Sequence, residues 1–223
     1  MAENFVEALM AEIAPLRERA IGHPLLDDIG SGALSRPQLQ TFAEQMYHFL
    51  VEAEYRFSAV SVVRSPDIES LKRNLQHAVD EASHMPLWLR FADKIGCDEA
   101  RMQRAQPRPG TLAFVNYFYR LSFLGTPAEV AAGAGLPEGV FAPQCERLGD
   151  GLVKHYGLSP QDAEFFFVHA VEDRTHERLH HWRIETYATT AAMRERVRAA
   201  ARLGFAYYLE MFDAIREAVR ETA

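Results

Sequence analysis

Two short stretches of the sequence repeat one spacing of residues that can bind metal ions. In HAVDEASH, residues 77–84, and in HAVEDRTH, residues 169–176, a carboxylate follows one histidine by four positions and precedes another by three. Positions i, i+4 and i+7 share one face of an α-helix. Imidazole nitrogens and carboxylates suit iron and related metals. The pattern therefore indicates a metal site that involves six side chains: His77, Glu81, His84, His169, Asp173 and His176.

The duplication is more informative than either copy alone. A single acid-x-x-His pair on a helix most often marks a solvated face. Two such pairs on two helices, with one carboxylate from each of two others, are the ligand set of helical-bundle di-iron sites. The second copy also follows the apolar run at Phe165–Phe167, and a buried His169 would need a partner. We expect iron, with manganese as an alternative because the ligand types suit both.

Further carboxylates are needed to complete such a site. Glu138 is one candidate, because it lies in the apolar segment GLPEGVFAP, where an unpaired charge would be costly. It is equally compatible with an acidic residue in a first helical turn after Pro137. The second helix carries three other candidates, Glu44, Glu52 and Glu54. Glu52 is favoured because His48 precedes it by four residues on the same face.

Other side chains are assigned by their surroundings in the sequence. Tyr47 and His48 are expected to line the pocket and act in catalysis. Three histidines are interpreted as surface or capping residues: His155, His180 and His181. Three arginines are candidates for holding a substrate carboxylate: Arg120, Arg174 and Arg178.

The elements that position these residues are predicted to be helices throughout. Apolar side chains recur every three or four residues over 3–20 and 189–220. Ser35 and Gln38 form a capping box, Ser65-Pro66 and Thr126-Pro127 begin helices, and Pro86 predicts a kink near 83–86. HPLLDDIGSG, residues 23–32, is expected to be a loop. About seven helices with short connections predict one all-α domain over residues 1–223.

Composition excludes several other classes of protein. The formal net charge of −7 makes a nucleic acid an unfavourable partner. No apolar run reaches the roughly 18 residues that span a bilayer, so no membrane partner is expected. Two cysteines are too few for a disulfide framework, and the N-terminus lacks the basic start and apolar run of a signal peptide. We expect a cytoplasmic protein.

Three blocks of the sequence resemble one family. FAEQMYHF, NLQHAVDEASHMPLWLRFADKIG and GLVKHYGLSPQDAEFFFVHAVEDRTH are similar to the heme-oxygenase-like all-helical superfamily. That group includes thiaminase II, the cofactorless oxidase of pyrroloquinoline quinone biosynthesis, and di-iron oxidases and oxygenases. The resemblance implies a heme-oxygenase-like bundle and a homodimer. It also implies five metal ligands, with Glu138 as the bridging glutamate: His84, Glu138, His169, Asp173 and His176.

The sequence departs from the di-iron members at His77. Many of them have glutamate seven residues before the histidine that matches His84, whereas the quinone-forming oxidase has histidine there. We expect Glu81 to replace the missing carboxylate as a ligand, with His77 as an extra ligand or a proton-handling catalytic residue. A mononuclear or metal-free site is the open alternative. Thiaminase II is disfavoured because its catalytic cysteine has no counterpart in a matching place.

The resemblance implies an O2-dependent non-heme iron oxidase or oxygenase with two irons per chain. Its substrate would be a small amino-acid-like or fatty-acid-like molecule, and the reaction a desaturation, a C–C cleavage or an oxygenation at nitrogen or carbon. Some relatives consume one of their own tyrosines, for which Tyr47, Tyr117 and Tyr119 are candidates. The alternatives are a metal-independent oxidase resembling the quinone-forming enzyme, and a non-catalytic iron-binding protein.

Overall fold

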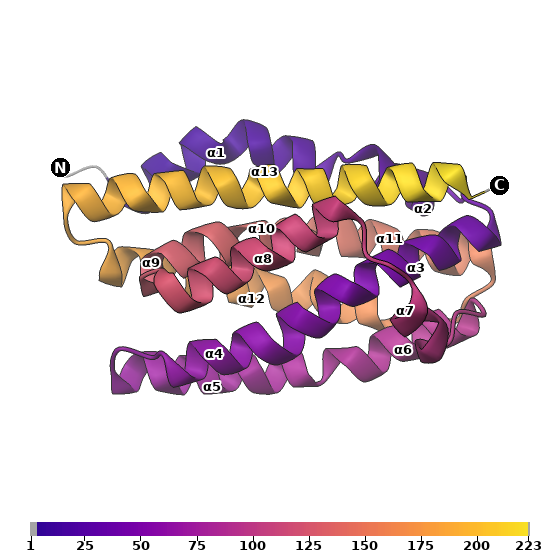
Figure 1. Ribbon diagram of the computed structural model, residues 1–223, viewed down its shortest axis with the longest axis horizontal. Coiled ribbons are helices and arrows are strands. Elements are labelled where there is room, and N and C mark those ends of the chain that lie inside the picture. The colour runs from indigo at the N-terminus through magenta and orange to yellow at the C-terminus, as the bar shows by residue number, and fades with distance from the viewer. Residues whose placement is uncertain (1–3, 223) are drawn as a thin grey trace.

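The computed structural model of the protein describes residues 4–222, without the side chains of residues 53–55. Every regular element in this range is helical (Figure 1). The elements in chain order are α1 (Phe5–Ile21), α2 (Pro24–Gly30), α3 (Arg36–Leu50), the π-helix η1 (Val51–Phe57), α4 (Ser58–Val63), α5 (Ile68–Ala82), α6 (His84–Lys94), α7 (Glu99–Arg104), α8 (Pro109–Leu124), α9 (Pro127–Val130), the π-helix η2 (Ala131–Gly135), α10 (Leu136–Glu138), α11 (Phe141–Tyr156), α12 (Glu164–Tyr187) and α13 (Ala191–Glu221).

The described chain thus has more and shorter elements than the seven helices expected. Two of the long helices contain π-helical segments, which a 3.6-residue apolar period does not reveal. The segment at 23–32 is also helical over Pro24–Gly30, so the loop expectation was wrong. There the His23 imidazole accepts a hydrogen bond from the Leu25 N–H at 3.3 Å, and Pro24 occupies the first helical position.

Local capping explains where several helices begin. The capping boxes at Ser35/Gln38 and Thr126/Glu129 are both present. Helix α5 begins slightly later than expected, because Asp67 rather than Ser65 is its cap. The Asp67 carboxylate accepts from the Ser70 N–H at 2.8 Å. Start signals that satisfy a backbone N–H were therefore readable from the sequence, within two residues.

The long helices lie in layers (Figure 1). Helix α13 runs the length of the molecule and packs against α1, α3 and α8. Helices α4 and α5 pair on the opposite side, while α12 lies in the interior against α11, α6 and η2. Both stretches singled out in the sequence consequently face the middle of the bundle.

Small residues allow η2 to approach its neighbours closely. A Cβ on Gly204 of α13 would lie 2.1 Å from the Gly133 oxygen, and a Cβ on Gly135 would lie 2.2 Å from His180 Nδ1 of α12. Neither distance is compatible with a side chain, so glycine is required at these contacts. The close approach brings Glu138, at the end of α10, to the face of α12 that carries the second stretch.

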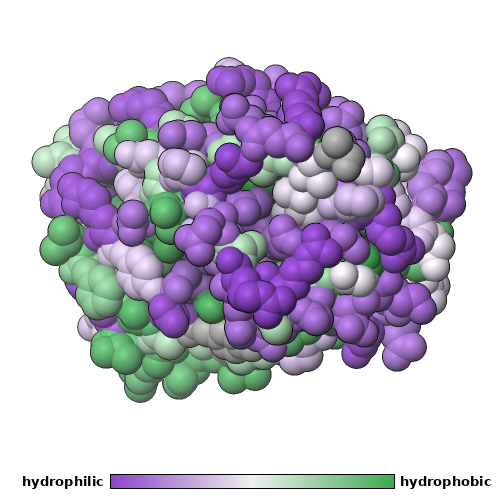
Figure 2. Space-filling view, turned by 45° about the vertical axis from the view of Figure 1, so that its right-hand side comes forward, coloured by the Kyte–Doolittle hydropathy of each residue, from purple (hydrophilic) through white to green (hydrophobic). Residues whose placement is uncertain are grey.

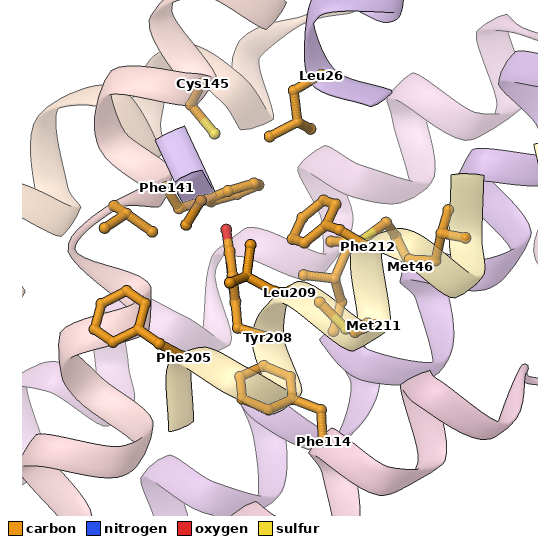
Figure 3. Packing of buried hydrophobic residues seen from close by; sticks show 14 of the residues in the cluster. Leu26, Met46, Phe114, Phe141, Cys145, Phe205, Tyr208, Leu209, Met211 and Phe212 are labelled. Atoms are coloured by element: carbon orange, nitrogen blue, oxygen red, sulfur yellow. The ribbon is translucent and has the colours of Figure 1, made fainter. Parts of the chain in front are cut away.

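Buried apolar side chains from most helices form one contiguous core cluster. Figure 3 shows part of it, where Tyr208, Met211 and Phe212 of α13 lie near Met46 of α3 and Phe114 of α8. The surface is mostly polar, with apolar side chains gathered along its lower left edge (Figure 2). Among residues 4–222, no helix is both long enough and apolar enough to cross a membrane.

Candidate metal centre

The first stretch is divided by a helix break. Helix α5 ends at Ala82, and His84 is the first residue of α6. Pro86 explains the break, because in a continuing helix its ring would clash with the backbone carbonyl of Ala82, four positions earlier. The kink expected at 83–86 is therefore confirmed. The second stretch lies entirely within α12, which has 24 residues and no interruption.

Four side chains from three helices converge on one point. The ligand atoms of His77, Glu81, Glu138 and His176 all lie within 4.8 Å of one another. His176 Nδ1 is 2.7 Å from Glu138 Oε1 and 3.3 Å from Glu81 Oε1. His77 Nε2 is 3.3 Å from Glu81 Oε1 and 3.5 Å from Glu138 Oε1. Two imidazoles thus face two carboxylates, and the gap between these four groups is about as wide as one atom.

A second group adjoins the first through Glu81. Its other oxygen, Oε2, is 3.5 Å from His84 Nδ1, and the rings of His84 and His169 are 4.2 Å apart between centroids. Asp173 Oδ1 is 3.8 Å from His176 Nδ1. All of these side chains are buried. The structure therefore brings residues of both stretches together with Glu138, and their binding of metal stays a prediction.

Hydrogen bonds fix the orientation of His169. Its Nδ1 is 2.7 Å from the Phe165 carbonyl oxygen, which can only accept, so Nδ1 carries the proton. The lone pair is then on Nε2. A backbone carbonyl that sets the tautomer in this way is typical of metal-binding histidines.

His180 was wrongly interpreted as a surface or capping residue. It is 3% exposed, and its Nε2 lies 3.0 Å from Glu138 Oε2. Its Nδ1 accepts from Arg183, since a guanidinium can only donate, and Nε2–H therefore donates to Glu138. The signal was present in the sequence, because His180 continues the four-and-three spacing of His169, Asp173 and His176. His155 is exposed, as expected.

The carboxylates control the charge of the facing histidines. Burial lowers the pKa of His77, but Glu138 and Glu81 outweigh it and raise this pKa to about 9. Burial likewise opposes the ionisation of Glu81, yet the facing imidazoles of His77 and His84 lower its pKa to about 2. His169 differs, because burial and the neighbouring His84 lower its pKa to about 4. Without metal, the centre is a network of imidazolium–carboxylate pairs beside a neutral histidine.

Several predicted residues do not reach this cluster. The Glu52 carboxylate accepts from Arg56 at 2.8 Å and from the Tyr119 hydroxyl. Tyr47 donates to Glu99 at 2.9 Å. On α3 the residues that line the interior cavity are Met46, Phe49 and Leu50, and Tyr47 is not among them. Two more predicted residues do not reach the cluster. His48 is absent from the residues that line the cavity, and Glu44 pairs with Arg101. The Glu54 side chain lies outside the described residues.

A partly open cavity of about 100 Å³ lies beside the cluster. His77, Glu81, Glu138, His169 and Asp173 form one wall. The remaining wall is mainly aromatic and methionine side chains, part of which is visible in Figure 3. Cavities of similar size hold a molecule such as benzene. Polar groups that converge at one side of an apolar cavity are typical of a small-molecule site.

The donor atoms fit a divalent transition metal. His77 Nε2 and His84 Nδ1 are buried and make no hydrogen bond of ordinary geometry to any described residue. Each nitrogen faces a Glu81 oxygen, at 3.3 and 3.5 Å respectively, without the geometry of a hydrogen bond, and a cation between imidazole and carboxylate would be a partner for both. The mixture of imidazole and carboxylate ligands matches what iron and manganese accept.

Comparison with known proteins identifies relatives along most of the chain. The model of the TENA/THI-4/PQQC family matches residues 10–212. A protein of Nitrosomonas europaea named 4-aminobenzoate synthase is 31% identical, over 97% of this chain and 93% of that protein. An aminopyrimidine aminohydrolase of Halalkalibacterium halodurans is 24% identical over 58% of each chain.

Solved structures show the same fold. A TenA homologue from Pseudomonas syringae superimposes with a TM-score of 0.84 at 12% identity, covering 96% of this chain and 93% of that one. A domain from Shewanella denitrificans described as having a heme oxygenase-like fold gives 0.79 at 19% identity, with 95% and 92% covered. The protein therefore has the all-α heme-oxygenase-like fold that the sequence predicted.

Proposed function

The chain belongs to the TENA/THI-4/PQQC family, and from that premise we propose that it is an O2-dependent non-heme iron enzyme with two irons per chain. Its substrate is a small organic molecule. The observation that carries the proposal is the buried convergence of His77, Glu81, Glu138 and His176, with the second group adjoining it. Relatives named as enzymes support a catalytic role for the fold.

The two adjoining groups suggest how the metals would be divided. One ion would take ligands from Glu81, Glu138, His176 and the unusual His77. The other would use His84, His169 and Asp173, with Glu81 or Glu138 shared between the two. Glu52 is not included, because its carboxylate is engaged by Arg56 and Tyr119. When bound, iron would activate O2, which is the oxidant of the substrate.

The chain's own residues prepare this chemistry. His180 donates to Glu138 and fixes the direction of its carboxylate, as the Phe165 carbonyl does for His169. The aromatic and methionine wall gives the cavity a mainly apolar lining opposite the metal centre. Without metal the His77 imidazole, whose pKa is raised to about 9, carries a proton at neutral pH, and this proton would leave when His77 binds the ion.

The relative named 4-aminobenzoate synthase supports a more specific product. Its similarity extends over 97% of this chain. A small aromatic amine is therefore a candidate product, to be sought by chromatography after the iron-loaded protein is exposed to O2 and a reductant. The cavity, comparable in volume with one that holds benzene, is compatible with such a molecule.

A metal-independent enzyme is the second candidate function. It is favoured by His77, a histidine in the position where the resemblance places a carboxylate, and by the raised pKa that makes it an acid at neutral pH. Thiol chemistry is disfavoured, because burial raises the pKa of Cys145 well above its usual value and that of Cys97 to about 11. Manganese in place of iron, a homodimer and a cytoplasmic location stay predictions.

Anaerobic titration with Fe(II) tests the proposal. The metal-free protein is expected to bind near two irons per chain and to give a transient visible absorbance on mixing with O2. His176→Ala should lose binding, while His155→Ala, on an exposed histidine, should not. No binding of iron, or equal binding by the His176→Ala protein, would contradict the proposal and favour the metal-independent enzyme.

A further inference from the structure

Arg183 is a buried cation at the wall of the cavity. It lies on α12, is 4% exposed, and has no carboxylate within ion-pair distance among the described residues. Burial lowers the pKa of its guanidinium, but only to about 10, so the group is charged at neutral pH. The charge of Glu138, on the other side of His180, offsets part of the cost of burial, but a buried charge without a direct ion-pair partner is still costly. Such a group is expected where an anion binds.

Two neighbours hold the guanidinium in a defined orientation. Its Nη1 donates to His180 Nδ1 at 3.0 Å, and its Nη2 donates to Asn74 Oδ1. Asn74 is itself fixed, because its amide donates to the Ser61 carbonyl at 2.8 Å and to Ser65 Oγ at 2.9 Å. These contacts use only some of the N–H groups of the guanidinium. The others can form the paired hydrogen bonds that arginine makes with a carboxylate.

The guanidinium lies where two cavities share a wall. Beside the cavity at the metal centre is a second, of about 50 Å³, between α4, α5 and the end of α8. Arg183, Ser61 and Ser122 line both. The serine hydroxyls offer further hydrogen bonds to an anion. Between this polar corner and the wall formed by the metal centre, the lining of the first cavity is mainly apolar and includes Phe57 and Phe118.

The guanidinium is also connected to the metal centre. Arg183 bonds to His180, and His180 bonds to Glu138, each at 3.0 Å. A ligand anchored at Arg183 therefore lies about one imidazole ring from the carboxylate that faces His176. The three arginines considered from the sequence cannot do this, because Arg120, Arg174 and Arg178 are all exposed.

We propose that Arg183 binds the carboxylate of the substrate, which is an organic acid with a compact apolar body, and that this contact directs the body into the cavity beside the metal centre. The proposal deepens the proposed function by naming the substrate class, and it rests on that function only in calling the ligand a substrate. Binding of the acid itself needs no metal.

The wild-type protein is tested first, with benzoate and its neutral analogue benzamide as probes. Binding to the metal-free protein is measured by calorimetry or by changes in the NMR spectrum. Benzoate is expected to bind roughly 10-fold to 100-fold more tightly than benzamide, the range that a charge-assisted pair provides. Equal affinity for the two probes would overturn the proposal, whatever any variant does.

Arg183→Gln then shows whether this arginine causes the preference. The preference for benzoate should disappear, and Arg183→Lys should keep part of it because the charge remains without the planar fork. Arg178→Gln, on the exposed side of the same helix, is the matched control and should bind like the wild type. If the preference survives in a folded Arg183→Gln protein, the anion binds at the His77 cluster instead and the proposal is wrong.

The outcome can be separated from that of the proposed function. If the protein prefers benzoate through Arg183 but binds no iron, the proposed carboxylate site is supported and the proposed iron chemistry is wrong. If the protein binds two irons but does not distinguish benzoate from benzamide, the proposed metal centre is supported and the proposed carboxylate site is wrong. If Arg183→Gln does not fold, the wild-type comparison and Arg183→Lys still decide the question.

Discussion

HAVDEASH and HAVEDRTH have the same spacing but different supports. The first is divided between α5 and α6, so that His77 and Glu81 lie on one helix and His84 begins the next. The second lies on the uninterrupted α12, where the same face continues to His180 and Arg183. One helix therefore supplies two of the proposed histidine ligands, a residue that orients Glu138, and the buried arginine. The other supplies the residues that depart from the pattern.

The two stretches also differ in charge, for a reason that cannot be read from the spacing of their residues. His77 faces Glu81 and Glu138, which raise its pKa to about 9. His169 faces the His84 ring and the side chain of Phe165, and its pKa falls to about 4. Identical positions in a pattern thus have opposite protonation states. Spacing determines which way a side chain points, and the neighbours from other helices determine its charge.

The largest expected effect distinguishes the two halves as metal ligands. His176→Ala removes a nitrogen at the centre of the cluster, and we expect iron affinity to fall more than about 100-fold, beyond the range for residues that only orient ligands. His77→Ala should cost about 10-fold, because Glu81 remains beside it. Calorimetric titration with Fe(II) under anaerobic conditions measures both. Equal losses would show that the two stretches contribute alike.

The opposite pKa values predict opposite effects of pH on the stability of the metal-free protein. The folded pKa of His77, about 9, is above the unfolded value of 6.5, so its stabilisation is full below pH 6.5 and is lost as pH rises through 9. The folded pKa of His169, about 4, is below 6.5, so stability falls as pH decreases from 6.5 toward 4. About 1.36 kcal/mol per pKa unit gives on the order of 3 kcal/mol for each.

Denaturant unfolding in chelator at several pH values measures these contributions. His77→Gln should flatten the alkaline decrease in the free energy of unfolding, and His169→Gln should flatten the acid decrease. Glu81, whose pKa is lowered to about 2, adds its own loss below pH 4.5, so the acid comparison is made between pH 6.5 and 5. If either variant flattens the opposite limb, the assignment of charge to the two stretches is wrong.

The fold and most of the cluster were predictable because they depend on local patterns. Capping boxes, the break at Pro86 and the common face of each stretch all follow from residues near one another in the sequence. Glu138 was found from its apolar surroundings. Tyr47 and His48 were misplaced relative to the cavity, because the apolar residues Met46, Phe49 and Leu50 are the ones on α3 that line it. Glu52 was misplaced because it lies in the π-helix η1, where the register of the helix decides which face points inward. A π-helical segment changes that register without a sequence signal.

The role of Arg183 could not be predicted in the same way. Its spacing from His180 places it on the interior face, but exposed arginines on α12 have similar local surroundings. What distinguishes Arg183 is its partner Asn74, which lies on α5, more than a hundred residues earlier in the sequence. Asn74 accepts a hydrogen bond from the Arg183 guanidinium. The identity of such a partner depends on how two helices pack, and that is set by side-chain volumes across the whole core.

An intermediate effect is expected where η2 supports the α12 stretch. Gly135→Ala would place a methyl group 2.2 Å from His180 Nδ1, so His180 must move from Glu138. Overpacking of this kind costs about 1–3 kcal/mol of unfolding free energy. Iron affinity should fall as well, by roughly 10-fold, as for loss of an orienting residue. Gly22→Ala, whose added carbon would meet only the Glu18 oxygen at 3.4 Å, is the matched control.

The smallest effect is expected at the helix break in the α5 stretch. Pro86 is exposed, and replacing it with alanine should change the free energy of unfolding by less than about 1 kcal/mol. Iron affinity should stay within about 3-fold, because His84 is held by its contacts with Glu81 and Glu172, at 3.5 and 2.9 Å, rather than by the break itself. The same titration with Fe(II) measures this. If iron affinity fell as much in Pro86→Ala as in His84→Ala, the helix break itself would orient His84. The first stretch would then depend on the backbone geometry of that break, whereas the second depends on a continuous helix.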